Sequence, residues 1–266
     1  MVGGGVRDLL LGREPKDFDV ATDAHPEEVK DVFGRSCRLI GRRFRLAHVR
    51  MGREIIEVAT FRAPHDPQEV RDGADHEMDN GMIVRDNVYG TVEEDAFRRD
   101  FTVNALYYNI ADFSVIDYGR GMEDLKEGRL RLLGDPEVRY REDPVRMLRA
   151  VRFAAKLGFN IDEESERLIP QMASMLGEVP SARLYDECLK MFHGGQALET
   201  FEKLRHYHLF EVLFPETEAC LAEEEEHFPI TFVNHGLANT DARIRDNMSV
   251  TPAFLFAVVM WEPVRR

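Results

Sequence analysis

The chain has 266 residues, of which 44% are hydrophobic, and this is ordinary for a globular protein with a real core in one large or two modest domains. Its formal net charge of −14 argues weakly against binding nucleic acid, which usually requires a basic surface. Charge is distributed unevenly, however, and residues 35–53 carry arginines and no acid. A local basic surface therefore remains compatible with the acidic total.

No apolar run approaches the ~20 residues that span a bilayer, and no basic-then-apolar leader is present. The cysteines lie far apart without metal-ligand spacing, which is typical of unpaired thiols in a reducing compartment. They are Cys37, Cys188 and Cys220. We expect a cytoplasmic protein.

The first half of the chain mixes helix and strand patterns. Helices are predicted from Val6 to Leu11, from Pro26, and from Thr91 to Arg99, where Thr91 and Glu94 form a capping box. A polar stretch at 63–81, rich in Gly, Pro, Asp and His, predicts a long loop. Strands are predicted at 16–20, 38–40, 45–49, 54–61, 114–117 and 129–133.

Beyond about residue 135 the strand patterns stop. Asp143 and Pro144 predict a helix start, and Gly158 ends that helix after Lys156. Helical periodicity returns at 163–176, 181–193, 196–206 and 251–261. We therefore expect an α+β head at 1–134, a helical neck at 135–180 and a helical body at 181–266. Both ends indicate a segment of a longer chain.

Two short segments near the N-terminus have the composition of a phosphate and metal site. In Asp17-Phe18-Asp19, strand alternation would place both carboxylates on one face, ~6–7 Å apart, where they can share a divalent ion or hold two. The glycine turn at Gly3 to Gly5, which leads into a helix, allows backbone N–H groups to approach a phosphate. Taken alone, Asp17-Phe18-Asp19 is as well explained by an exposed polar edge of a sheet. The glycine turn, taken alone, is as well explained by an ordinary turn.

Four motifs together resemble one family. Residues 3–8 (Gly-Gly-x-Val-Arg-Asp), followed by a Leu-Leu-Gly and by Asp-Phe-Asp, are similar to the head of the class II tRNA nucleotidyltransferase and bacterial poly(A) polymerase family. Residues 98–106 resemble the family's second head motif, and residues 142–149 its nucleotide-selecting motif. The order of the motifs also agrees. The resemblance implies a polymerase-β-like nucleotidyltransferase head with a mixed sheet, followed by an all-helical neck and body.

The resemblance also implies roles for individual residues. Asp17 and Asp19 would hold two Mg²⁺ ions while an RNA 3′-OH attacks the α-phosphorus of a nucleoside triphosphate. Asp100 would be a third acid, with Glu57 on a neighbouring strand as its rival. Nucleotide contacts would come from Gly3, Gly4, Arg7, Arg98 and Arg99. An (i, i+3) pair between Asp95 and Arg98 is the alternative for the last pair of arginines.

Asp143, Arg146 and Arg149 would select the base. Residues three apart share a helix face, so a carboxylate could accept from the adenine amine while an arginine donates to a ring nitrogen. Arg149, one turn further on, would reach the same nucleotide. A solvated charged helix face is the alternative.

The segment 39–49 bears on the choice between family members. It resembles the Gly-Arg-Arg-Phe-x-Leu segment of bacterial poly(A) polymerases rather than the threonine- and glycine-rich segment of CCA-adding enzymes. Arg42, Arg43 and Arg45 would then contact RNA through its backbone, although a basic edge strand is the alternative. We predict addition of AMP from ATP to RNA 3′ ends. A CCA-adding tRNA nucleotidyltransferase, or a non-catalytic fragment that binds RNA or nucleotide, would be the other possibilities.

Overall fold

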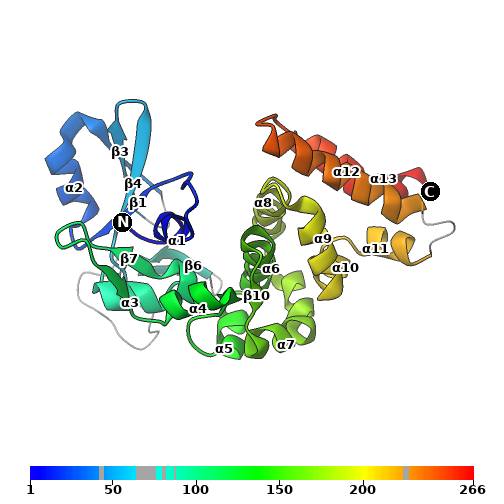
Figure 1. Ribbon diagram of the computed structural model, residues 1–266, viewed down its shortest axis with the longest axis horizontal. Helices are drawn as coiled ribbons and strands as arrows, with labels where there is room; N and C mark the ends of the chain where they lie inside the picture. The colour runs from blue at the N-terminus through cyan, green and yellow to red at the C-terminus, as the bar shows by residue number, and fades with distance from the viewer. Residues whose placement is uncertain (42–44, 64–75, 80–81, 87, 224–227) are drawn as a thin grey trace. The chain divides into compact units, whose positions relative to one another are not determined.

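The computed structural model describes residues 1–41, 45–63, 76–79, 82–86, 88–223 and 228–266. The chain divides into two compact units, Met1–Glu127 and Gly128–Arg266 (Figure 1). The first is a mixed α/β unit and the second is mainly helical, so the predicted fold class is confirmed. The roles assigned above to 1–134, 135–180 and 181–266 stay predictions.

A four-stranded sheet forms the centre of the first unit. Its order is β1 (Asp19–Thr22), β4 (Glu54–Thr60), β3 (Leu46–Met51) and β2 (Cys37–Ile40). β1 runs parallel to β4, whereas the other two pairs are antiparallel. The helix α2 (Pro26–Phe33) covers one face, where Val29 packs with Cys37, Ala47 and Val49.

Charged residues occupy the opposite face of this sheet. Because neighbouring residues across a ladder share a face, the register places four of them in one row. The row runs from Asp19 on β1 through Glu57 on β4 and His48 on β3 to Arg38 on β2. A charged row of this kind cannot be buried without partners, so it marks the face on which a site can form.

The N-terminal segment extends the sheet. Val2 forms antiparallel bridges to Asp19 and to Tyr107, and its N–H donates to the Asp19 carbonyl over 3.0 Å. These bridges connect β1 to β7 (Leu106–Tyr108), which pairs with β8 (Val115–Asp117). At Gly3 the backbone has φ of 73°, which favours glycine, and α1 (Gly4–Leu10) follows.

The first predicted strand starts later than expected. β1 begins at Asp19, so Asp17 and Phe18 precede it, and Phe18 is exposed rather than turned to the core. The backbone here passes close to α1, since a Cβ at Gly5 would lie 3.1 Å from the Asp17 carbonyl oxygen. Alternation along a strand therefore does not explain the relation of Asp17 to Asp19.

The remainder of the first unit includes a hairpin in the predicted loop. β5 (His76–Asp79) pairs with β6 (Met82–Asp86), so residues 76–79 form a strand and the prediction of a continuous loop over 63–81 was wrong there. The helix α3 (Val92–Phe97) begins with the predicted capping box, in which the Glu94 N–H donates to Thr91 Oγ1. A short 3₁₀ turn (Thr102–Asn104) and α4 (Gly121–Glu127) complete the unit.

The second unit is a set of packed helices. One short parallel pair, β9 (Arg129–Leu130) with β10 (Asn160–Ile161), lies among them. The helix α6 (Val145–Leu157) ends at Gly158 in the left-handed conformation, as predicted. The other helices are α5 (Pro136–Glu142), α7 (Glu163–Met172), α8 (Ser181–Phe192), α9 (Ala197–His206), α10 (Leu209–Leu213), α11 (Pro215–Ala222), α12 (Phe228–Arg245) and α13 (Pro252–Arg265).

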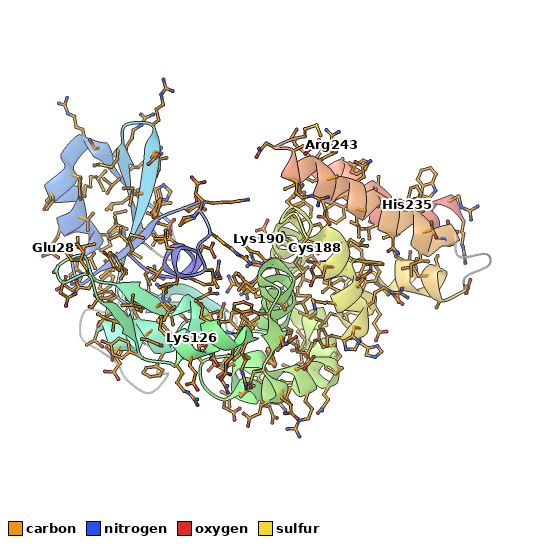
Figure 2. All side chains as sticks on the ribbon, viewed as in Figure 1. Glu28, Lys126, Cys188, Lys190, His235 and Arg243 are labelled. Atoms are coloured by element: carbon orange, nitrogen blue, oxygen red, sulfur yellow. The ribbon has the colours of Figure 1, made fainter. Side chains whose placement is uncertain are left out.

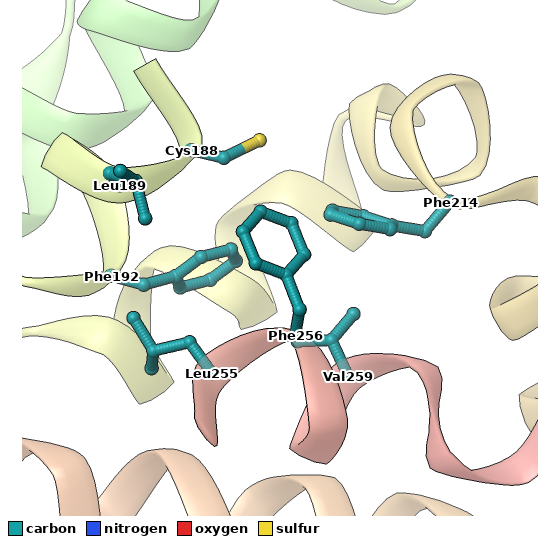
Figure 3. Close-up of a pocket in the computed structure, with 7 residues that line it drawn as sticks. All are labelled: Cys188, Leu189, Phe192, Phe214, Leu255, Phe256 and Val259. Carbon is teal, nitrogen blue, oxygen red and sulfur yellow. The ribbon is translucent and has the colours of Figure 1, made fainter. Parts of the chain in front are cut away.

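An apolar cluster lies between α8 and α13 (Figure 3). Burial raises the pKa of the Cys188 thiol to about 12, so this side chain stays protonated and packs as a small hydrophobe. The cluster consists of Cys188, Leu189, Phe192, Phe214, Leu255, Phe256 and Val259. Within the described parts of the chain, no helix is both long and apolar enough to cross a membrane.

Candidate active site and base-recognition region

The glycine turn and the second head motif lie against each other in the first unit. A Cβ at Gly3 would lie 3.2 Å from Arg99 Nη1, so a larger residue would push this guanidinium away. Arg7 is only 2% exposed, and it donates from Nε and Nη2 to Asp8 Oδ1 over 2.8 and 2.6 Å. It also donates to Asn104 Oδ1. Arg7 thus joins α1 to the 3₁₀ turn, and its contact with phosphate stays a prediction.

Asp95 and Tyr107 hold Arg99 in place. Arg99 donates from Nε and Nη2 to Asp95 Oδ2 over 3.3 and 3.2 Å, and from Nε to the Tyr107 hydroxyl over 3.0 Å. Burial raises the pKa of Tyr107, so its hydroxyl stays protonated and donates to Asp95 Oδ2 over 2.6 Å. Arg98 Nε lies 4.0 Å from Asp95 Oδ1, which is the (i, i+3) pair considered as the alternative. Arg99 therefore presents an oriented positive charge beside the glycine turn.

Asp19 carries an unfavourable negative charge. Partial burial raises the pKa of its carboxyl, and the charges of Glu57 and then Asp17 raise it further, whereas Arg99 lowers it. Glu57 is the direct partner of Asp19 in the β1–β4 register. A group of carboxylates that disfavour one another's charge is stabilised by a bound cation.

Glu57, the rival of Asp100 for the third acidic position, lies beside Asp19. Glu57 is the first acid acting on Asp19, and His48 Nε2 lies 3.4 Å from its Oε2. Asp100 is half-buried in the turn after α3, directly before the buried Phe101. Its place among the metal-binding acids stays a prediction.

The acids around Asp19 are compatible with a Mg²⁺ site in which substrate phosphates supply the remaining ligands. No set of three or more His, Cys, Asp or Glu side chains that could hold a metal is found in the described ranges. Mg²⁺, however, is usually bound through one or two carboxylates together with substrate phosphates and water. Asp17 and Asp19 would supply carboxylate oxygens for such a site, and Glu57 lies beside Asp19.

The predicted base-recognition residues lie in the second unit, but they do not share one helix. Asp143 is extended, with φ of −151°, and it lies between α5 and α6. Its Oδ1 accepts from the Val145 N–H over 3.2 Å. Arg146, on α6, donates from Nη1 to the Arg139 carbonyl over 2.7 Å and to Glu142 Oε2 over 3.0 Å. The shared helix face was therefore wrong for Asp143, because the helix starts after it.

The predicted RNA-binding arginines are only partly described. Arg42 and Arg43 lie outside the described residues. Arg45 is half-exposed and forms an ion pair with Glu27, which begins the helix α2 with Pro26 and Glu28. Their contact with RNA stays a prediction.

Several residues of these regions were missed from the sequence. Asp95 was named only as a partner of Arg98, although its (i, i+4) spacing also allows the observed pairing with Arg99. His48 could have been found as a neighbour of Glu57 once the strand register was guessed. Asn104 and Tyr107 lie within or beside the second motif but gave no signal of their role. Nothing in the sequence connected Arg183, on α8, with Asp143, 40 residues away.

Comparison with known proteins agrees with this architecture. A solved structure of tRNA nucleotidyltransferase, complexed with a primer tRNA and an incoming ATP analog, matches 97% of this chain and 78% of that chain, with a TM-score of 0.67 and 26% identity. The fold is therefore that of the nucleotidyltransferases. Residues 1–131 match the poly A polymerase head domain, and residues 158–221 match the probable RNA and SrmB-binding site of polymerase A.

The similarity is higher to poly(A) polymerases than to CCA-adding enzymes among the relatives considered. Poly(A) polymerase I of Salmonella typhimurium is 55% identical over 264 residues, which are 99% of this chain and 57% of that protein. A CCA-adding enzyme of Lactobacillus helveticus is 39% identical over 201 residues, 76% of this chain and 47% of that protein. The chain belongs to the bacterial poly(A) polymerase family, and it spans little more than half the length of these poly(A) polymerases.

Proposed function

We propose that this chain carries out template-independent addition of AMP from ATP to RNA 3′ ends. The observation that supports this most directly is the acidic group around Asp19, next to the glycine turn and the oriented Arg99. A protein that only binds RNA has no use for acidic side chains gathered around Asp19, because such charges repel a polyanion.

The chain's own residues supply most of the chemistry. The turn at Gly3 and Gly4 lets backbone approach a triphosphate, and Arg99, held by Asp95 and Tyr107, places a positive charge near its oxygens. Asp17 and Asp19 would hold two Mg²⁺ ions. When bound, these lower the pKa of the RNA 3′-OH and neutralise the leaving pyrophosphate. Asp143 and Arg146 would recognise adenine, and Arg42, Arg43 and Arg45 would contact the RNA backbone.

CCA addition is the second candidate function. It is favoured by the solved tRNA nucleotidyltransferase bound to tRNA and ATP analog, which matches nearly the whole chain. The arginine-rich segment at 42–45 and the higher identity to poly(A) polymerase favour polyadenylation. The three cysteines are buried and unpaired, which agrees with a role in the cytoplasm.

Primer extension separates these functions. The chain is incubated with Mg²⁺, each NTP alone, and either a generic RNA or a tRNA lacking its 3′ CCA. Polyadenylation predicts long tails from ATP alone on both RNAs, whereas CCA addition predicts only C, C and A on the tRNA. No extension of either would contradict both and leave a binding function.

Variants at the acids complete this experiment. Asp17→Asn and Asp19→Asn should each lower incorporation by about 10³-fold or more, because several kcal/mol of charge stabilisation is lost. Asp31→Asn, on the exposed side of α2, is the matched control and should retain activity. Near-normal incorporation by either of the first two would contradict the metal-binding assignment.

A further inference from the structure

One face of α8 carries charged side chains that form ion pairs with Asp143 and Arg149, two of the predicted base-recognition residues. Arg183, Glu187 and Lys190 follow a spacing of four and then three residues, so they share a helix face. Arg183 Nη2 donates to Asp143 Oδ2 over 2.6 Å. Glu187 Oε1 lies 3.7 Å from Arg149 Nε, and Lys190 Nζ donates to it over 2.9 Å. Figure 2 labels Lys190 at α8.

Arg183 restricts the direction of the Asp143 carboxylate. The Asp143 side chain is 16% exposed, and both of its oxygens are used, Oδ1 by the Val145 N–H and Oδ2 by Arg183. An ionised carboxylate has about four acceptor positions, so it can still accept from a ligand. One contact to each oxygen restricts rotation of the carboxylate, and therefore restricts where its remaining lone pairs point.

Glu187 acts on Arg149 in a similar way. Its side chain is 5% exposed, and its Oε2 has no hydrogen-bond partner in the described structure. Burying an ionised carboxylate is unfavourable unless nearby cations compensate its charge. For Glu187 these cations are Arg149 and Lys190. Glu187 Oε1 and Arg149 Nε form an ion pair at 3.7 Å, so the buried carboxylate attracts the Arg149 guanidinium.

We infer that Arg183 and Glu187 are positioning residues for nucleotide choice: α8 orients Asp143 and Arg149, and neither α8 residue contacts the base. The inference rests on the proposed function, since it assigns the selection of ATP to these side chains. If the inference holds, the preference for ATP depends on α8, which lies outside the motif at residues 142–149 that carries Asp143 and Arg149.

Binding of ATP and CTP to the whole chain, with Mg²⁺ and without RNA, tests the inference by titration calorimetry. The measured quantity is the ratio of the Kd for CTP to the Kd for ATP. Arg183→Ala should lower this ratio about tenfold, which is within the coupling expected of neighbouring charged groups. Arg183→Lys, which keeps the charge, should restore part of the ratio. Arg167→Ala, an exposed arginine on α7, is the matched control and should leave it unchanged.

The double variant Arg183→Ala with Asp143→Asn shows whether Arg183 acts through Asp143. If it does, Arg183→Ala has no further effect once Asp143 is altered. An unchanged ratio in Arg183→Ala, or additive losses in the double variant, would overturn the inference while leaving the proposed function intact. Equal binding of ATP and CTP by the unaltered chain would instead overturn the proposed base choice together with it. Glu187→Gln repeats the test for Arg149, and an unaltered ratio there would remove Glu187 from the inference.

Discussion

Around Asp19, acidic side chains face other acidic side chains, whereas around Asp143 and Arg149 each charge faces an opposite one. The first region has a raised carboxyl pKa, which means that its charged form is unfavourable in the free protein. The second has ion pairs that hold each side chain without a ligand. This difference agrees with the proposed function, in which the acids around Asp19 gain stability when a cation binds and the groups around Asp143 are oriented before the nucleotide arrives.

The largest effect expected to test this difference between the two regions concerns the third acidic residue, Glu57 or Asp100. If the like charges around Asp19 are built for cations, Glu57→Gln should reduce incorporation by about 100-fold and increase the Mg²⁺ concentration needed for half-maximal rate. Asp100→Asn should change the rate without this shift in Mg²⁺ requirement. The measurement is initial rate against Mg²⁺ concentration for both variants.

His48 supplies a control for this experiment, because it contacts Glu57 from the neighbouring strand. His48 Nε2 lies 3.4 Å from Glu57 Oε2. His48→Gln retains a side chain that can hydrogen-bond and should keep the Mg²⁺ requirement close to that of the unaltered chain. If Asp100→Asn raises the Mg²⁺ requirement and Glu57→Gln does not, the third acid is Asp100 of the second head motif and not Glu57, the neighbour of Asp19 in the sheet.

The next effect concerns the oriented region. Arg146→Ala should lower the preference for ATP over CTP by about 5- to 150-fold, since a well-placed donor pair contributes about 1–3 kcal/mol of base discrimination. Its incorporation of ATP should fall much less than in the acid variants. The ratio of kcat/KM values for ATP and CTP is the measurement.

Arg141 is a suitable control for Arg146. It lies on α5, is 63% exposed, and pairs with Glu137 on its own helix. Arg141→Ala should leave the preference unaltered. Retained selectivity in Arg146→Ala would mean that the ion pairs of this region serve stability and not recognition.

The sequence was a good guide where function and local pattern coincide. The glycine turn, the capping box at Thr91 and the helix ended by Gly158 all follow from short-range rules, and the mixed sheet followed by helices was confirmed. Boundaries were less certain, because tertiary contacts decide them. β1 starts at Asp19 since the preceding backbone passes against Gly5, and no propensity encodes that contact.

The partners of the site residues were the least predictable part. Arg7 is buried and contacts Asp8 and Asn104, and the Asn104 contact joins residues 97 positions apart, which residue spacing does not predict. Arg183 and Asp143 are separated by 40 residues, and their pairing depends on how α8 packs on α6. Such pairs follow from helix packing, which residue spacing in one sequence does not specify.

The smallest expected effect is on stability, and it tests the unfavourable charge of Asp19 directly. Its pKa is raised above the ordinary 3.8, so the folded state disfavours the charged form more than the unfolded state does. Below pH 3.8 both states are protonated and there is no penalty. As pH rises through the raised pKa, the penalty develops and then stays constant. Asp19→Asn removes it, so the variant should unfold at a higher temperature at pH 7, by roughly 1–3 °C, and the gain should disappear towards low pH.

Mg²⁺ provides the complementary measurement by thermal unfolding at pH 7. A cation that binds the acidic group stabilises the folded state, so added Mg²⁺ should raise the Tm of the unaltered chain more than that of Asp19→Asn. Asp31→Asn should respond like the unaltered chain at every pH, because the Asp31 side chain is exposed on α2. A lower Tm in Asp19→Asn at pH 7 would contradict this prediction. It would show that attraction to Arg99 outweighs burial and repulsion from the neighbouring acids, so that the Asp19 charge is stabilised by an opposite charge, as the Asp143 charge is.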